Sequence, residues 1–192
     1  MYTEHPVNKL QNHISGWYIE TTLWDEIVSE CNRKKILFEK ETTDWRGYSR
    51  GFLHKINKSL FENYLGILDN CLNLYKQQYP FLKECPKLKL ATPDSDKTVS
   101  AVKLQKYKPG KYYSELHCEN DGMYPYRTLV YMTYLVDIDG GGTDFPQQQF
   151  ETKSQKGLTL IWPASFTHPH IGIPAEKDTK LIMTGWWEWD LS

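Results

Sequence analysis

Two histidine-containing segments and a lysine are the residues of this chain best suited to chemistry. The segment LHCENDG places His117 and Glu119 two residues apart, and FTHPHIG places His168 and His170 two residues apart. Side chains at positions i and i+2 of a strand share a face, so we expect the imidazole of His117 and the carboxylate of Glu119 to point the same way. Together they would supply half of a metal site.

A histidine from the FTHPHIG segment would complete a donor set of two imidazoles and one carboxylate. This set is the facial triad of non-heme iron(II) oxygenases, which leaves coordination positions open for substrate and oxygen. His170 follows His117 by 53 residues, which suits a third ligand delivered by a distant strand. The spacing alone also leaves a zinc hydrolase or a cupin-type isomerase open.

The clearest element among those that must position these residues is a long helix. Within residues 59–80, apolar and aromatic side chains recur at steps of three and four, which predicts one packed helical face. Ser59 and Glu62 fit a capping box at the start, and Pro80 marks the end.

The segments before this helix are less regular. We expect residues 1–16 to form a polar lead-in, and residues 17–34 to form a short strand followed by a helix. Thr21 or Thr22 would cap that helix. Residues 35–57 mix aromatic and charged side chains, and we predict an irregular segment there.

The chain changes character after residue 80, where prolines separate short segments rich in β-branched and aromatic residues. These segments predict strands: VSAVKLQKY, YYSELHCEN, TLVYMTYLVD, GLTLIWPAS and KLIMTGWWEW. Helices followed by a run of strands indicate an α+β fold, mainly β, with a helical layer against an antiparallel sandwich or barrel. We expect one domain over 1–192, with helical support over about 17–82 and the β core over about 98–190.

Charge and composition exclude several classes of function. The 23 basic and 24 acidic residues give a net charge of -1 without a long basic stretch, so we expect no nucleic-acid partner. No apolar segment reaches the length of a membrane span, and the first residues lack the pattern of a signal peptide. The four cysteines form no C-x-x-C pair or disulfide framework. We therefore expect a cytoplasmic protein, in the host cytoplasm if the chain is viral.

The stretch from Tyr107 to Trp187 resembles the prolyl and lysyl hydroxylase branch of the 2-oxoglutarate-dependent iron(II) oxygenases. Its motifs follow the order of that family: the tyrosine of YKPG, the H-x-acid pair, an arginine opening a strand that ends Tyr-Leu, a G-G-x-T-x-F turn, a G-x-L-x-x-x-P strand, and a distal histidine followed by a basic residue. Glutamate in the H-x-acid pair and the segment THPHIG are most similar to small bacterial and phage members. The resemblance implies a double-stranded β-helix, a jelly-roll and cupin-like core, with N-terminal packing helices.

By this resemblance, His117, Glu119 and His170 are the iron ligands and the catalytic centre. In the family, a basic residue about ten positions after the distal histidine binds the far carboxylate of 2-oxoglutarate, and Lys180 follows His170 by ten. Glu119 departs from the commoner aspartate, and Asp121 is the alternative carboxylate ligand.

The resemblance assigns further residues to the cosubstrate pocket. Tyr134, Tyr107 and Thr143 match positions near 2-oxoglutarate, although the glycines before Thr143 equally suit a tight turn. Arg127 matches a family arginine, and we favour a structural ion pair for it. We favour a hydrogen-bonded loop residue for His168; if residues 166–170 are extended, the alternative is a position beside the metal or its open coordination site.

The implied reaction is hydroxylation of an unactivated C–H bond, coupled to decarboxylation of 2-oxoglutarate to succinate and carbon dioxide. It requires Fe(II), 2-oxoglutarate and O2, with ascorbate as a supporting reductant. The family implies a prolyl or lysyl side chain of a peptide or protein as substrate. The alternatives are a free amino acid or small metabolite, or a jelly-roll that binds a ligand or partner without turnover.

Overall fold

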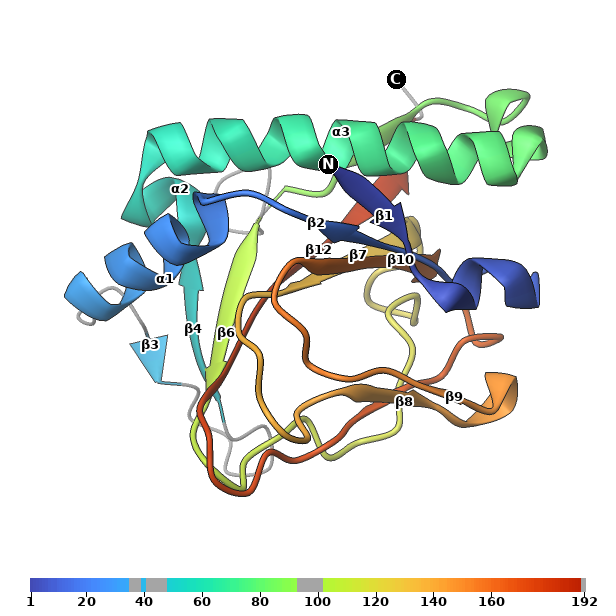
Figure 1. Ribbon diagram of the computed structural model, residues 1–192. Coiled ribbons are helices and arrows are strands. Elements are labelled where there is room, and N and C mark those ends of the chain that lie inside the picture. The colour runs from blue at the N-terminus through green and yellow to red at the C-terminus, as the bar shows by residue number, and fades with distance from the viewer. Residues whose placement is uncertain (35–38, 41–47, 93–101, 191–192) are drawn as a thin grey trace.

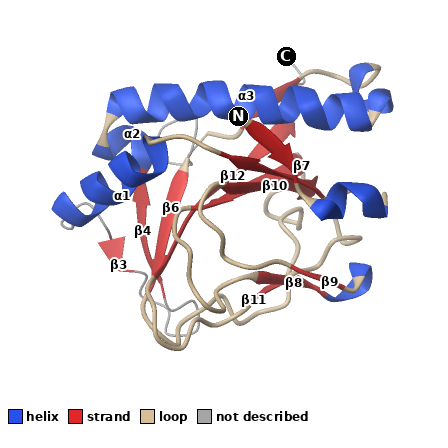
Figure 2. Ribbon diagram, in the orientation of Figure 1, coloured by secondary structure: helices blue, strands red, loops and turns tan. Residues whose placement is uncertain are grey.

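Two antiparallel sheets and a layer of helices build the fold of the computed structural model, which describes residues 1–34, 39–40, 48–92 and 102–190. The helices cover one face of the larger sheet, and the smaller sheet lies across its other face (Figure 1). Figure 2 shows the long connections that join the two sheets. This arrangement confirms the expected α+β, mainly β architecture with a jelly-roll core.

The larger sheet has nine strands, in the order β1-β2-β10-β7-β12-β6-β4-β3, with β5 paired to β12. Their bounds are β1 (Tyr2–Glu4), β2 (Ser15–Ile19), β3 (Glu39–Lys40), β4 (Tyr48–Phe52), β5 (Leu88–Leu90), β6 (Lys103–Tyr107), β7 (Arg127–Tyr134), β10 (Leu158–Pro163) and β12 (Lys180–Trp189). The smaller sheet has the order β11-β8-β9, formed by β8 (Thr143–Phe145), β9 (Phe150–Glu151) and β11 (Ile171–Gly172).

Three α-helices and three short 3-10 helices complete the described elements: α1 (Leu23–Arg33), α2 (Leu53–Ile56), α3 (Lys58–Gln78), η1 (Pro6–Leu10), η3 (Pro80–Lys83) and η4 (Pro146–Gln148). The long helix and its end before Pro80 are as predicted. The predicted capping box is wrong, because Asn57 has an extended backbone and its side chain accepts a hydrogen bond from the Leu60 amide at 3.2 Å. Ser59 therefore lies inside the first turn.

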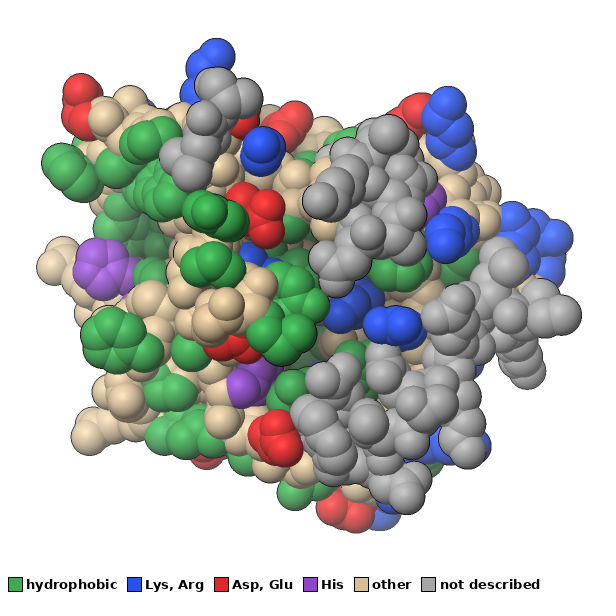
Figure 3. All heavy atoms as spheres, turned by 180° about the vertical axis from the view of Figure 1, so that it is seen from behind, with side chains coloured by type: hydrophobic (Ala, Val, Ile, Leu, Met, Phe, Trp, Pro, Cys, Tyr) green, Lys and Arg blue, Asp and Glu red, His purple; other side chains and the backbone are tan. Residues whose placement is uncertain are grey.

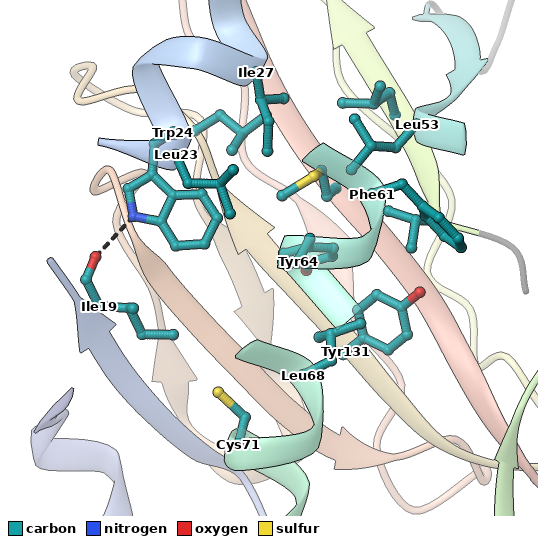
Figure 4. Packing of buried hydrophobic residues seen from close by; sticks show 14 of the residues in the cluster. Ile19, Leu23, Trp24, Ile27, Leu53, Phe61, Tyr64, Leu68, Cys71 and Tyr131 are labelled. Carbon is teal, nitrogen blue, oxygen red and sulfur yellow. Dashed lines mark hydrogen bonds between the residues drawn. The ribbon is translucent and has the colours of Figure 1, made fainter. Parts of the chain in front are cut away.

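The central strands β7 and β12 separate the two cores by their alternation of side chains. Leu129 and Tyr131 of β7 pack in the cluster under the helices, whereas Val130 and Met132 pack between the two sheets. Figure 4 shows Tyr131 facing α1 and α3, where the indole of Trp24 donates to the carbonyl of Ile19 at 2.7 Å. The alternation of side chains along the strands therefore buries one face of the sheet under the helices and leaves the other face available for a functional site.

Three other predictions for the chain need correction. Residues 1–16 form β1, η1 and the start of β2, and so extend the sheet instead of leading into it. Within 35–57, the described residues include β3, β4 and α2, while 35–38 and 41–47 lie outside the description. The segment 112–120 forms no strand; it contributes only an isolated bridge between His117 and His170. Its other backbone groups bond to Gly172 of β11 and to Ala164, just beyond β10.

No helix of the described residues is long and apolar enough to cross a membrane.

Truncation of Leu68 should test how strongly α3 supports the sheet. Leu68 is fully buried between α3 and the sheet, so we expect Leu68→Ala to lower the free energy of unfolding by about 2–5 kcal/mol through lost burial and a residual cavity. Leu10→Ala is the matched control, since Leu10 is 56% exposed and should cost less than about 0.5 kcal/mol. Urea denaturation of both variants measures the difference. Equal losses would contradict this packing.

Candidate metal centre

A two-residue backbone bridge brings the two segments of the predicted metal site together. The amide of His117 donates to the carbonyl of His170 at 3.1 Å, and the amide of His170 donates back at 2.9 Å. The amide of Glu119 then bonds to the carbonyl of Ala164 at 3.0 Å, just beyond β10. Three points of the chain are therefore fixed to each other by main-chain hydrogen bonds.

The side chains of His117, Glu119 and His170 converge at this bridge. Their ligand atoms all lie within 4.8 Å of one another. Oε1 of Glu119 is 3.4 Å from Nε2 of His117 and 3.9 Å from Nε2 of His170. The prediction that His117 and Glu119 share a face is met without a regular strand.

Hydrogen bonds to the backbone orient both imidazoles. Nδ1 of His117 lies 2.9 Å from the carbonyl of Glu115, and Nδ1 of His170 lies 3.1 Å from the carbonyl of His168. A carbonyl only accepts, so each Nδ1 carries the proton and each Nε2 presents a lone pair toward the shared space. Such second contacts normally fix the tautomer of a metal-binding histidine.

The charge states of the three groups suit metal ligands. Burial lowers the pKa of His170 to about 4, which keeps it neutral. Burial would raise the pKa of Glu119, but the hydrogen bond and charge of His117 outweigh it and hold the pKa at about 2. Burial likewise opposes the charge on His117, but Glu119 raises its pKa. A divalent cation would replace that proton as the partner of the carboxylate.

Arg127, for which we favour a structural ion pair, forms that pair with a predicted ligand. Its Nη1 lies 3.3 Å from Oε2 of Glu119, on the side of the carboxylate away from the histidines. The guanidinium also stacks at 3.6 Å over the ring of Trp186 and at 3.7 Å over that of Tyr124. Arg127 therefore belongs to the site, as the partner that holds the outer oxygen of Glu119.

Lys180 lies at the start of β12, on the face between the two sheets. Its side chain is 4% exposed, and its Nζ donates to the carbonyl of Gly142 at 3.1 Å. No salt bridge joins it to an acidic side chain in the described part of the chain, and burial lowers its pKa to about 7. A buried amine without a counterion is suited to an anionic ligand.

The triple glycine brings this carbonyl to Lys180. Gly140 and Gly141 have φ angles of 74° and 67°, and a Cβ on Gly142 would lie 1.9 Å from the carbonyl of Thr152. Only glycine therefore fits at position 142 of this tight turn. The next residue along the chain is Thr143.

Thr143 joins a buried hydroxyl cluster that also includes Tyr134. The Tyr134 hydroxyl lies 2.8 Å from Oγ1 of Thr143 and 2.7 Å from Oγ1 of Thr152. Lys180 Nζ lies 5.6 Å from the Tyr134 ring centroid and 5.5 Å from that of Tyr107. The sequence analysis missed Thr152, because no motif marks a threonine whose contact arises only when β8 and the segment after β9 meet.

A cavity of about 780 Å³ connects these groups. The three candidate ligands, Lys180, Thr143 and Tyr107 all line it, and so do Arg127, Trp162 and Trp186. Tyr134 does not, since its hydroxyl lies behind Thr143. The ammonium of Lys180 and the candidate ligands thus face one shared cavity.

The two alternatives weighed for this region lie outside the cluster. Asp121 accepts hydrogen bonds from the amides of Met123 and Tyr124 within a turn, and does not join the ligand atoms. His168 is 4% exposed, and its Nε2 lies 2.8 Å from the carbonyl of Asn12. It is the hydrogen-bonded loop residue that we expected, and it ties the loop of His170 to the N-terminal segment.

Comparison with known proteins gives a result only at the level of structure. No family model and no curated protein matches the sequence. A prolyl-4-hydroxylase of Pseudomonas putida superposes with a TM-score of 0.70 over 96% of each chain, at 19% identity. The chain has the fold of the prolyl hydroxylases.

Two further structures with this fold include bound molecules. The viral collagen prolyl hydroxylase of Paramecium bursaria Chlorella virus-1, in a 2OG complex, gives a TM-score of 0.67 at 19% identity, covering 93% of this chain and 97% of that one. A prolyl hydroxylase of Trichoplax adhaerens, in complex with a hypoxia inducible factor peptide fragment, gives 0.66 at 14% identity, covering 95% and 86%. The fold implied by the sequence resemblance is therefore confirmed.

Loss of the His168 side chain should weaken metal binding, because its hydrogen bond to Asn12 anchors the loop whose carbonyl orients His170. We expect His168→Ala to raise the dissociation constant for Co²⁺ by roughly 10–100-fold. Gln can donate an amide N–H toward the same carbonyl, so His168→Gln should recover much of the affinity. Titration followed by the Co²⁺ absorption spectrum measures both. Identical metal affinity in wild type and His168→Ala would contradict this anchoring role.

Proposed function

We propose that this protein is an Fe(II)- and 2-oxoglutarate-dependent dioxygenase that hydroxylates an unactivated C–H bond. The observation that carries the proposal is the shared cavity. It contains two imidazoles and one carboxylate that can bind a metal, and a buried ammonium that has no carboxylate partner in the part of the chain that the structure describes. The fold, common to the prolyl hydroxylases described above, supports the same conclusion.

The donor set fits a ferrous ion. Nε2 of His117, Nε2 of His170 and Oε1 of Glu119 would hold it, and both imidazoles already have their other nitrogen bonded to the backbone. Two nitrogens and one hard oxygen on one side of a metal leave its remaining positions open. When bound, iron and 2-oxoglutarate supply the oxidation of the C–H bond, with O2 consumed and succinate and carbon dioxide released.

The chain's own residues bind the cosubstrate and control the surroundings. Lys180 would hold the carboxylate of 2-oxoglutarate that is distant from the metal, and the Tyr107 ring and Thr143 would flank it. A charge-assisted hydrogen bond in this buried part of the cavity is strong, and the ammonium of Lys180 acts in it as a point charge. Arg127 holds Oε2 of Glu119, which leaves Oε1 for the metal.

The substrate we propose is a prolyl side chain of a peptide or protein. The support is the fold shared with prolyl hydroxylases, one of them in complex with a peptide fragment. The cavity is also wider than a five-carbon diacid needs, since its volume of about 780 Å³ lies toward the upper part of the ~300–1,000 Å³ range of ligand sites.

Removal of a metal ligand should abolish turnover without unfolding the chain. We expect His170→Ala and Glu119→Gln to lower succinate formation by at least about 100-fold, since each removes a donor to iron. His54→Ala is a control for loss of a histidine outside the ligand cluster. Succinate is measured with Fe(II), 2-oxoglutarate and ascorbate present. Full activity of His170→Ala, or activity of the wild type without O2, would contradict the proposal.

The pH dependence of cosubstrate binding should report Lys180. Burial lowers the pKa of Lys180 from 10.5 to about 7. Between pH 7 and pH 10.5, Lys180 is therefore protonated in the unfolded chain and neutral in the folded protein without ligand. This lysine therefore makes folding more favourable as pH rises through that window. A carboxylate favours the ammonium form, so binding of 2-oxoglutarate must take up a proton there.

We expect the affinity for 2-oxoglutarate to fall above about pH 7, by up to about tenfold per pH unit. Calorimetry in two buffers of different ionisation enthalpy, with Mn²⁺ replacing iron to prevent turnover, measures the uptake of close to one proton. Lys180→Met should bind weakly, and its residual binding should take up no proton. Equal proton uptake in wild type and Lys180→Met would exclude Lys180 as the carboxylate partner.

A further inference from the structure

Glu119 and Arg127 are joined through their side chains and also through the loop between them. Nη1 of Arg127 donates to Oε2 of Glu119 at 3.3 Å. The side-chain amide of Asn120 donates to the carbonyl of Arg127 at 2.7 Å and to that of Pro125 at 3.1 Å. The backbone amide of Asn120 donates to the carbonyl of Ala164 at 2.8 Å. These hydrogen bonds hold the start of β7 next to the candidate ligand.

Two aromatic rings fix the guanidinium of Arg127 in this position. Its Cζ lies 3.6 Å from the ring centroid of Trp186 and 3.7 Å from that of Tyr124. Such contacts attract the cation and restrict the rotamers of a long side chain. All three residues line the cavity. Figure 3 shows charged, histidine and hydrophobic side chains close together near the middle of the face opposite to that of Figure 1.

The contact with Arg127 gives the two oxygens of Glu119 different surroundings. Oε1 lies 3.4 Å from Nε2 of His117 and 3.9 Å from Nε2 of His170, whereas Oε2 accepts from Nη1 of Arg127. A forked arginine pair would occupy both oxygens, but here a single nitrogen makes the hydrogen bond. Oε1 is therefore the oxygen that faces the two imidazoles.

The other acidic residues that line the cavity do not replace Glu119 as the partner of Arg127. They are Glu115, Asp121 and Glu188. Among the described residues, Glu119 is the one carboxylate at salt-bridge distance from the guanidinium. The carboxylate of Asp121 accepts two backbone amides within its own turn, and Glu115 is exposed.

The position of Oε2 decides how many coordination positions Glu119 would occupy. A carboxylate binds a metal through one oxygen or through both. Two imidazoles and one carboxylate oxygen leave about three positions of an octahedral ion open, and the adjacent keto and carboxylate oxygens of a 2-keto acid need two of them. A glutamate free to turn Oε2 toward the metal would remove one of these positions. The hydrogen bond from Arg127 opposes that turn.

We propose that Arg127 is a positioning residue that holds Glu119 in coordination through one oxygen, and thereby keeps one metal position free for the cosubstrate. This inference rests on the proposed function and concerns how the same site keeps room for its ligands. Loss of Arg127 should then affect two ligands in opposite ways. Metal should bind as tightly or more tightly, because Oε2 becomes a further donor and a nearby positive charge is removed. 2-Oxoglutarate should bind more weakly.

The test counts the water molecules on bound Mn²⁺ by water-proton relaxation, in the full chain without O2. In the wild type we expect about three exchangeable waters, of which about two leave when 2-oxoglutarate binds. In Arg127→Gln the relaxation by bound Mn²⁺ should fall by about a third, since Oε2 replaces one water. The affinity for Mn²⁺ should not decrease, while the affinity for 2-oxoglutarate should fall by about tenfold or more.

Two further variants separate this role from a general effect on the fold. Arg127→Lys keeps a positive charge and a donor for Oε2, so it should restore the water count and bring the affinity for 2-oxoglutarate to within about threefold of the wild type. Arg33→Gln is the matched control, because it removes the arginine of an exposed pair with Glu30 at 2.8 Å. It should leave the water count and both affinities unchanged.

Three outcomes overturn the inference while the proposed function stands, provided that the wild type binds 2-oxoglutarate and forms succinate. The first is a wild type that keeps only about two waters on Mn²⁺, which decides the question even if Arg127→Gln does not fold. The second is Arg127→Gln with unchanged relaxation. The third is loss of Mn²⁺ affinity in that variant with the water count retained. Failure of 2-oxoglutarate to bind to the wild type with metal present excludes both the inference and the proposed function.

Discussion

The buried ammonium of Lys180 is the constraint on which the organisation of this protein depends. Strand alternation in β12 places it on the face between the sheets, where the carbonyl of Gly142 is its one hydrogen-bond acceptor within the described residues. Burial without a counterion is costly, and its lowered pKa expresses that cost. A dianion that bridges this amine and a metal would relieve the cost, and the same cavity contains the donors to hold that metal.

The rest of the fold keeps these groups in fixed relation. The helices bury one face of the larger sheet, and the other face packs a second core between the sheets and borders the cavity. In the N-terminal segment, β2 pairs with β10 of the larger sheet. The hydrogen bond between the carbonyl of Asn12 and His168 connects the same segment to the loop of His170. Tyr75 of α3 bonds the carbonyl of His13 at 2.8 Å. A continuous series of hydrogen bonds thus joins the supporting helix to the loop of His170.

Sequence predicts the features of this protein that depend on local composition and period. Enrichment in β-branched and aromatic residues identifies β7, β10 and β12, and the three-to-four step identifies α3. The resemblance to the hydroxylase family, with Lys180 ten residues after His170, selects His117, Glu119 and His170, which the structure brings together. Contacts between segments that are distant in the sequence cannot be predicted in this way. Examples are the isolated bridge between His117 and His170 in place of a strand, and the choice of Glu119 as the partner of Arg127. The hydrogen bond between Thr152 and Tyr134 is another.

The most direct test of the central claim is a crystal structure of the protein prepared anaerobically with Fe(II) and 2-oxoglutarate. The account predicts one metal ion bound by Nε2 of His117, Nε2 of His170 and one oxygen of Glu119, with the far carboxylate of 2-oxoglutarate on Nζ of Lys180. A metal bound elsewhere, or a cosubstrate whose carboxylates leave Lys180 without an anionic partner, would contradict it.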